Sequence, residues 1–200
     1  MTLAASQKNS NQGRLFVVSG PSGAGKGTLV TAALEAFPNL SLSISATTRK
    51  PRAGDVEGKT YYFVSDEQFD ELLENGGLLE WAQVHGCRYG TLADEVNKAL
   101  NAGKDLILEI DLQGFRQIKT NRDDVFSIFI APPSMNELKR RLEYRGTEDA
   151  NSIKDRLATA QVELGAQDSY TVTIINDDLE EAKHELIEII EQQLGRQDAR

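Results

Sequence analysis

The sequence predicts an α/β fold in which a parallel sheet core is flanked by helices and carries one inserted lobe of mixed α/β structure. Three observations support this prediction. Short apolar runs alternate with amphipathic segments along most of the chain. A glycine-rich loop joins the first such run to the first amphipathic segment. A stretch from about residue 46 to 91 interrupts the alternation. Alternating strands and helices are typical of parallel sheets with helices on both faces.

The first predicted strand is "RLFVVS" at 14–19, a β-branched and aromatic run that ends in the glycine-rich turn. From Lys26 onward the apolar residues recur with helical spacing until Pro38, which predicts a helix. Further strands are predicted at 105–110, 125–131 and 171–176. A last helix follows, with an apolar stripe made of Leu179, Ala182, Leu186, Ile190 and Leu194.

The inserted stretch contains two short strand-like runs, "TYYFV" at 60–64 and "LLEWAQV" at 78–84. Between them Ser65 and Gln68 have the spacing of a capping box, which predicts the start of a helix. The same spacing at Ser134 and Glu137 predicts a helix that runs to about Arg145.

Composition excludes several classes of protein. The net charge of −9 argues against a broad nucleic-acid surface. No apolar run approaches the roughly 18 residues that a membrane span needs. Residues 1–13 read as a flexible polar tail without the pattern of a secretory signal. The single cysteine, Cys87, excludes an internal disulfide and suits a cytoplasmic protein. We expect no catalytic role for Cys87, His85 or His184.

The loop "GPSGAGKGT" has the spacing of a phosphate-binding loop, because four residues separate a glycine from a Gly-Lys pair. Its members are Gly20, Pro21, Ser22, Gly23, Ala24, Gly25, Lys26, Gly27 and Thr28. Backbone N–H groups of such a loop surround phosphate oxygens, and Lys26 is expected to reach the terminal phosphates. Gly27 stands where a metal-binding hydroxyl is usual, so Thr28 is the candidate magnesium ligand, directly or through water. The alternative is a glycine-rich turn with a surface lysine.

Nearly the whole chain after the tail resembles guanylate kinase, the family that transfers the γ-phosphate of ATP to GMP. The ordered segments that carry the resemblance are "GPSGAGKGT", "TTRKPRAGD", "YYFV", "EWAQV", "YGT", "LEIDLQG", "IFIAPPS", "RLEYRGTE" and "IIND". The resemblance implies ATP and GMP, with dGMP as a further acceptor, as substrates in purine nucleotide metabolism, and Mg²⁺ as cofactor. It also implies one domain over 14–200, with a core at 14–45 and 92–200, a GMP-binding lobe at about 46–91 and a mobile lid at about 145–156. No feature of the sequence indicates the oligomeric state.

By resemblance, Arg49, Arg52 and Tyr61 hold the acceptor phosphate, and Ser45, Glu80, Tyr89 and Thr91 surround the guanine. Glu109 and Asp111 would lie near the phosphates and acceptor, with Asp111 a further candidate ligand of magnesium, directly or through water. Arg145 and Arg156 would be lid arginines that close on ATP, with Arg141 beside them and Asn176 near the adenine. We therefore expect Lys26, Arg49, Arg145 and Arg156 to be catalytic.

The chemistry of these residue types supports the assignment. Guanine presents an N1–H and a 2-amino group side by side, and the carboxylate of Glu80 can accept from both. A hydroxyl such as that of Ser45 or Thr91 can donate to guanine O6. Adenine would leave such a buried carboxylate without a partner, which gives strong discrimination. The alternative is a structural Glu80 that pairs with an arginine.

Three other functions stay open at this point. One is a protein-interaction module without activity, although Lys26, Arg145 and Arg156 are all present. Another is a phosphotransferase with a different acceptor, such as AMP or a phosphorylated ribose. The third is an NTPase switch, which would need no second nucleotide pocket.

The sequence departs mildly from the family pattern in three places. Asp55 stands where the family often has Glu, and the segments "HGCRYG" and "GAQDSYTV" are divergent.

Overall fold

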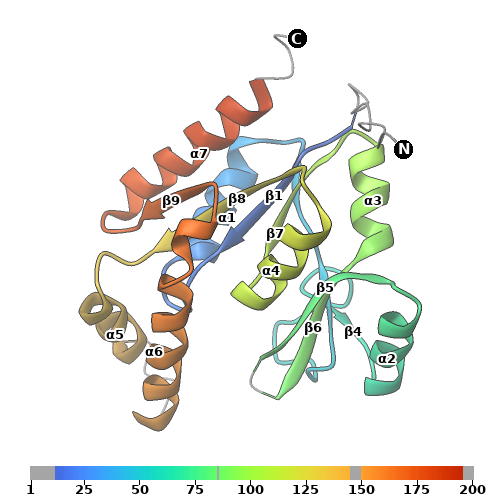
Figure 1. The fold of residues 1–200 in the computed structure, drawn as a ribbon, viewed down its shortest axis with the longest axis horizontal. Coiled ribbons are helices and arrows are strands. Elements are labelled where there is room, and N and C mark those ends of the chain that lie inside the picture. The colour runs from blue at the N-terminus through green and yellow to red at the C-terminus, as the bar shows by residue number, and fades with distance from the viewer. Residues whose placement is uncertain (1–11, 85, 145–149, 196–200) are drawn as a thin grey trace, which may run out of the picture.

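The computed structural model describes residues 12–84, 86–144 and 150–195, and its elements form two sheets with helices around them (Figure 1). The strands are β1 (Leu15–Ser19), β2 (Leu40–Leu42), β3 (Ser45–Thr47), β4 (Tyr62–Phe63), β5 (Leu78–Val84), β6 (Cys87–Leu92), β7 (Asp105–Glu109), β8 (Val125–Ala131) and β9 (Val172–Ile175). The helices are α1 (Lys26–Ala36), α2 (Asp66–Glu74), α3 (Ala93–Asn101), α4 (Leu112–Asn121), α5 (Met135–Tyr144), α6 (Ala150–Leu164) and α7 (Leu179–Gly195).

The main sheet is entirely parallel, with the strand order β2-β7-β1-β8-β9. Its central strand β1 is buried along its whole length, because helices cover both faces of the sheet. Phe16 and Val18 pack with α1 and α7 on one face, while Leu15 and Val17 pack with α3 and α4 on the other. This arrangement confirms the predicted parallel sheet flanked by helices.

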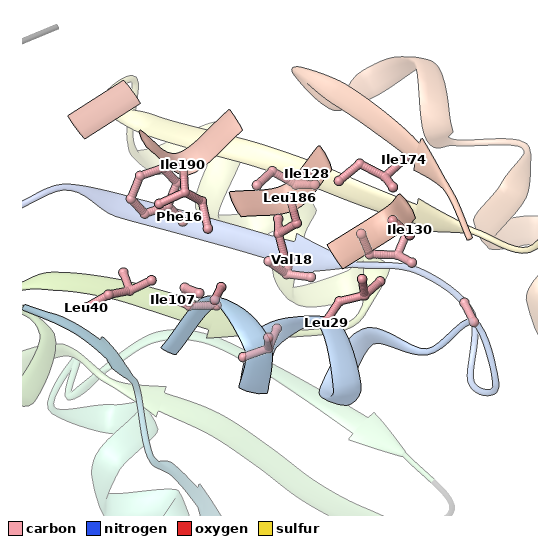
Figure 2. Packing of buried hydrophobic residues seen from close by; sticks show 14 residues of the cluster. Phe16, Val18, Leu29, Leu40, Ile107, Ile128, Ile130, Ile174, Leu186 and Ile190 are labelled. Atoms are coloured by element: carbon pink, nitrogen blue, oxygen red, sulfur yellow. The ribbon is translucent and has the colours of Figure 1, made fainter. Parts of the chain in front are cut away.

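Figure 2 shows the face that α1 and α7 cover, where Phe16 and Val18 of β1 lie close to Leu186 and Ile190 of α7. Leu29 of α1 belongs to the same cluster, at the first turn of the helix that follows the glycine loop. The buried stripe of α1 therefore fixes the loop against the carboxyl end of β1.

The second sheet has the order β4-β3-β6-β5 and mixes one parallel pair with two antiparallel pairs. Helix α2 accompanies it, and the predicted capping box at its start is present with both reciprocal hydrogen bonds between Ser65 and Gln68. Figure 1 shows this second sheet with α2 on one side of the carboxyl ends of the parallel strands, and α5 and α6 on the other. The mixed lobe predicted from the sequence is confirmed.

Some elements differ from the sequence-based expectation. Helices α3 and α4 and strands β2, β3 and β6 were not predicted, and the run at 60–64 forms a strand only at Tyr62–Phe63. At the start of α5 the Ser134 hydroxyl accepts from the backbone N–H of Glu137, but the Glu137 carboxylate binds Arg140 and Arg141. Two nearby guanidinium groups attract this carboxylate away from the helix end.

Of the expected lid, residues 145–149 lie outside the described residues, while 150–156 belong to the first turns of α6. The tail residues 1–11 also lie outside the described part of the chain. In the part that is described, no helix combines the length and the apolar character needed to cross a membrane.

Candidate active site

The glycine loop connects β1 to α1 in a tight turn that two of its glycines make possible. Gly20 has φ of 142°, and a Cβ there would lie 2.1 Å from the Ile130 carbonyl oxygen. Gly25 has φ of 96°, and a Cβ there would lie 2.3 Å from Nδ2 of Asn176. Larger residues would therefore be strained by both backbone conformation and contact.

The N-terminus of α1 is suited to an anion. Gly25 is its N-cap, and no side chain of the described residues caps it there. The first turn has no acidic residue. The N–H groups and the positive end of the helix dipole are thus available to phosphate oxygens.

A cavity of about 760 Å³ lies over this helix end. The loop residues that line it are Ser22, Gly23, Gly25, Lys26, Gly27 and Thr28, six of the nine predicted. Gly20, Pro21 and Ala24 shape the loop from behind; Ala24, for instance, donates its N–H to the Pro21 carbonyl at 3.1 Å. The cavity also reaches Thr31 and Glu35 of α1 and Lys183 of α7. Sequence reasoning missed these three because they belong to no motif.

Lys26 Nζ donates to the Gly20 carbonyl at 2.6 Å and to the Pro21 carbonyl at 3.0 Å. The ammonium group is therefore held across the loop, at the edge of the cavity where phosphates would lie. Glu109, at the end of β7, lines the same cavity. The protein around Glu109 removes part of the hydration of its carboxylate and so raises its pKa, while the charge of Lys26 opposes this shift.

Glu109 and Asp111 have different surroundings although only one residue separates them. Asp111 is the N-cap of α4, and its Oδ1 accepts from the Gly114 N–H at 2.9 Å. Its Oδ2 accepts from Nε2 of Gln113 at 3.0 Å. Glu109 thus lies in the cavity over the loop, while the Asp111 carboxylate is engaged with the start of α4.

The helices α5 and α6 reach the loop through two arginines. Arg156 Nη1 donates to the Ser22 hydroxyl at 3.0 Å. Arg141 donates through Nε to Glu137 at 2.8 Å and through Nη2 to the Asn176 carbonyl at 3.0 Å. Arg140 and Arg141 together lower the pKa of Glu137 to about 2. Arg145 lies outside the described residues.

Asn176 contacts the loop itself. Its side chain is 3% exposed, and Nδ2 donates to the Ala24 carbonyl at 2.7 Å. Gly25 leaves the space that this amide occupies. Asn176 therefore supports the loop from behind.

Glu80 is the most unusual group of the second lobe. It lies on β5 with 4% of its surface exposed, and its Oε1 accepts from the Thr91 hydroxyl of β6 at 2.5 Å. Burial raises its pKa to about 7, the Thr91 hydrogen bond opposes this shift, and the charge of Asp111 adds to it. Its side-chain hydrogen-bond partner is Thr91, and no arginine of the described residues forms an ion pair with it.

The neighbouring strands bring further predicted residues to this carboxylate. Ser45 of β3 and Glu80 of β5 both pair with Thr91 in the sheet register. Tyr89 pairs with Thr47 two positions along β6 and contacts the Tyr61 ring at 5.7 Å between centroids. The residues expected around the guanine thus meet on one sheet.

Arg49 lies beside the residues of the second sheet, because it contacts the Tyr61 ring that packs against Tyr89. Its guanidinium lies 5.2 Å from the Tyr61 centroid, and its Nη2 lies 2.9 Å from Oδ2 of Asp55. Burial raises the pKa of Tyr61. Arg52 contributes its backbone N–H to Asp55, while the residue is exposed. The backbone hydrogen bond from Arg52 lowers the pKa of Asp55, and the charges of Arg49 and Arg52 lower it further.

These features define the class of the protein. The structure combines a phosphate loop on a parallel sheet, arginines from flanking helices and a separate sheet with a buried carboxylate. This combination is typical of a phosphate-loop nucleotide kinase. The family model for guanylate kinase matches residues 12–193. The chain belongs to the guanylate kinase family.

Individual relatives agree with this family. The chain is 50% identical over 179 residues to a guanylate kinase of Rubrobacter xylanophilus, covering 90% of this chain and 94% of that protein. It is 49% identical to a guanylate kinase of Streptomyces kasugaensis, covering 92% and 90%. The solved guanylate kinase structure from Anaplasma phagocytophilum matches with a TM-score of 0.73 at 35% identity, covering 92% and 87%.

Proposed function

We propose that this protein transfers the γ-phosphate of ATP to GMP, giving ADP and GDP, and that it also accepts dGMP. The observation that carries the proposal is the buried Glu80–Thr91 pair, which lies on a lobe separate from the phosphate loop. A nucleotide kinase needs two nucleotide sites, and this carboxylate suits the acceptor that offers two adjacent N–H donors. Family membership supports the same activity.

For the donor, the loop residues 20–28 surround the ATP phosphates, and Lys26 contacts the terminal ones. Arg156 already reaches the loop through Ser22, which supports its role as a cation beside the same phosphates. Arg141, Arg145 and Asn176 complete the ATP side. Arg141 donates to the Asn176 carbonyl, and Asn176 in turn contacts the back of the loop, which favours a positioning role for both.

For the acceptor, Glu80 accepts from guanine N1–H and the 2-amino group, while Ser45 and Thr91 supply hydroxyls. Arg49, Arg52 and Tyr61 hold the GMP phosphate, with Tyr89 beside them. The fork of Arg49 suits two phosphate oxygens, because a guanidinium donates two parallel N–H bonds. Arg49, which pairs with Asp55, exchanges this contact for the GMP phosphate when GMP binds.

The reaction is an in-line displacement at the γ-phosphorus. A GMP phosphate oxygen forms the new P–O bond as the bond to the β–γ bridging oxygen breaks, and ADP leaves with that electron pair. The attacking oxygen is already anionic near pH 7, so no strong general base is required. Catalysis comes from alignment and from the cations Lys26, Arg49, Arg145 and Arg156.

Mg²⁺ is the metal that we propose, bound with the ATP phosphates. The hydroxyl of Thr28 and the carboxylate of Glu109 line the same cavity, and hard oxygen donors suit this ion, which retains several waters. Asp111 would act through water, since its two oxygens already accept from the Gly114 N–H and from Nε2 of Gln113. The ion supplies charge neutralisation on the transferring phosphate.

We further propose that the acceptor lobe at about 46–91 and the lid at about 145–156 close on the substrates, which keeps water from the γ-phosphate. A distance between labels on the lobe and on α6 should shorten when both nucleotides are added. An unchanged distance would contradict closure.

We propose a cytoplasmic location because the chain has a single cysteine, which suits a reducing compartment.

The activity is tested by ADP production from ATP and Mg²⁺ with GMP, AMP, CMP and UMP supplied separately, beside a control without acceptor. We expect rapid ADP production with GMP, and slow or undetectable production elsewhere. Preference for another monophosphate would overturn the acceptor assignment. ADP release without any acceptor would instead indicate hydrolysis, and no activity from folded protein would favour the interaction module.

A further inference from the structure

Glu80 lies directly against the backbone of α4, a helix of the core. A Cβ added at Gly114 would lie 2.1 Å from Oε2 of Glu80 and 2.9 Å from its carboxyl carbon. Real Cβ atoms do not come so close to other atoms. The Oε2 atom therefore occupies the space that any side chain at position 114 would need.

The backbone of α4 does not itself require a glycine at this position. Gly114 is absent from the residues with positive φ, and it lies in the first turn of a helix capped by Asp111. Glycine is less favourable than alanine within a helix. The close approach of Glu80 supplies the reason for a residue that the helix alone would disfavour.

One turn further along α4, Gln117 binds the strand that carries Glu80. Its Nε2 donates to the Trp81 carbonyl at 2.6 Å, and its Oε1 accepts from the Trp81 N–H at 3.2 Å. Strand β5 is the last strand in its sheet, so one of its edges has no strand neighbour. The amide of Gln117 pairs with both backbone groups of the residue that follows Glu80, as a neighbouring strand would.

Helix α4 is firmly fixed to the core on its other side. The Phe115 ring stacks on Tyr170 with 3.7 Å between centroids, and Lys119 Nζ donates to the Ser169 carbonyl at 2.6 Å. Phe115 and Ile118 are buried with β1 and β7 residues in one cluster. The helix is thus a rigid support against which β5 rests.

We propose that α4 positions the base-reading carboxylate of the acceptor site, with Gly114 and Gln117 as the positioning residues. Gly114 sets how deep the Glu80 carboxylate lies, and Gln117 holds the backbone of β5 beside it. Acceptor affinity therefore depends on a helix of the core. This inference rests on the proposed function, in which Glu80 reads guanine.

The first test replaces Gly114 by alanine and measures the KM values for GMP and ATP and the affinity for GMP by calorimetry. We expect the KM and Kd for GMP to rise about tenfold to a hundredfold, because misplacement of a contact by about 1 Å has effects of this size. The KM for ATP should stay within about twofold. Gly195→Ala is the matched control, since a Cβ at this helical glycine meets nothing within 4 Å and should change neither constant.

A second arm separates positioning from damage to the fold. Glu80→Asp shortens the side chain by one methylene, which makes room for a methyl group at position 114. The GMP affinity of Gly114→Ala/Glu80→Asp should exceed that expected from the product of the two single effects. Additive losses would mean that the two residues act independently and would overturn the role of Gly114.

The third arm tests Gln117 and stands even if Gly114→Ala fails to fold. Gln117→Ala should raise the KM for GMP about three- to thirtyfold through the loss of two hydrogen bonds, with an unchanged KM for ATP. Thr120→Ala is the control on the same helix, because this exposed hydroxyl donates to the Arg116 carbonyl of its own helix. Equal changes for both substrates, or none, would overturn the inference. A wild-type protein that ignores GMP would instead refute the proposed function.

Discussion

The phosphate loop and the proposed guanine site on the second sheet solve two recognition problems in opposite ways. The loop is contiguous, and it offers a helix N-terminus, a lysine and glycines that fit its turn. The proposed guanine site takes Ser45, Glu80 and Thr91 from three strands, and Glu80 lies against α4. Phosphates are alike in every nucleotide, so backbone groups suffice to bind them. A base must be distinguished from others, and this requires a buried charged group held in place from several directions.

The largest effect is expected at the loop. Lys26→Ala should lower kcat about 10³-fold, because it removes a cation placed where charge develops on the transferring phosphate. The Kd for GMP should stay nearly constant, since the two sites use separate elements. The measurement is steady-state ADP production together with calorimetric GMP binding.

The matched control is Lys104→Ala, which removes an exposed lysine just before β7, at the end of the sheet away from the loop. It should leave kcat unchanged. A Lys26→Ala protein with full activity would remove the donor site from this loop. A Lys26→Ala protein that has lost GMP binding would contradict the separation of the two regions.

A smaller effect is expected where the lobe holds a phosphate through side chains. Arg49→Lys keeps the charge but loses the bidentate geometry, and the KM for GMP should rise roughly tenfold, or about 1.4 kcal/mol. Arg122→Lys is the control, because Arg122 also pairs with an aspartate, Asp124, away from both sites. Equal KM values for the two variants would remove Arg49 from the acceptor site.

The smallest effect is a pH dependence confined to the acceptor. Glu80 has a pKa of about 7, raised by burial, with the charge of Asp111 adding to the shift. At pH 6 about nine-tenths of the empty protein carries a proton there, and guanine requires the ionised form. The KM for GMP should therefore rise as pH falls from 8 to 6, by at most about tenfold per pH unit, while the KM for ATP changes less.

The GMP phosphate also titrates, near pH 6, and needs a control. The Glu80→Gln variant keeps the pH dependence that comes from the GMP phosphate and should lose the part that comes from Glu80. Its KM for GMP should therefore change less with pH than that of the wild type. Identical profiles would show that Glu80 is not the titrating group.

The pH dependence of folding stability has the opposite sign to that of a usual carboxylate, because the pKa of Glu80 is higher in the folded than in the unfolded protein. Stability from neutral Glu80 is present below about pH 4.5 and is lost as pH rises toward about 7.

The two regions also differ in how far the sequence predicts them. The loop, β1 and α1 follow from neighbouring residues, and the capping box at Ser65 and Gln68 is found as predicted. The partner of Glu80 could not be derived in the same way, because Thr91 and Gly114 meet it only after folding. The sequence signal for this close approach was an isolated glycine, at position 114, within a segment that proved to be helical.

Residue types likewise did not reveal every role. Asp111 and Asn176 carry groups that suit a metal or a base, yet the structure engages them with the α4 N-terminus and the Ala24 carbonyl. Glu137 has the spacing of a capping box, but two arginines within one turn attract its carboxylate. Such choices depend on competition among nearby partners, which spacing alone does not describe.

The most direct test of base reading by Glu80 compares kcat/KM for GMP with that for IMP, which lacks the 2-amino group. In the wild type we predict a preference for GMP of about 10²-fold or more, because IMP leaves part of the buried carboxylate without a donor. In Glu80→Gln the ratio should fall to within about tenfold of unity. A ratio unchanged by this substitution would contradict the assignment of Glu80 as the residue that reads the acceptor base.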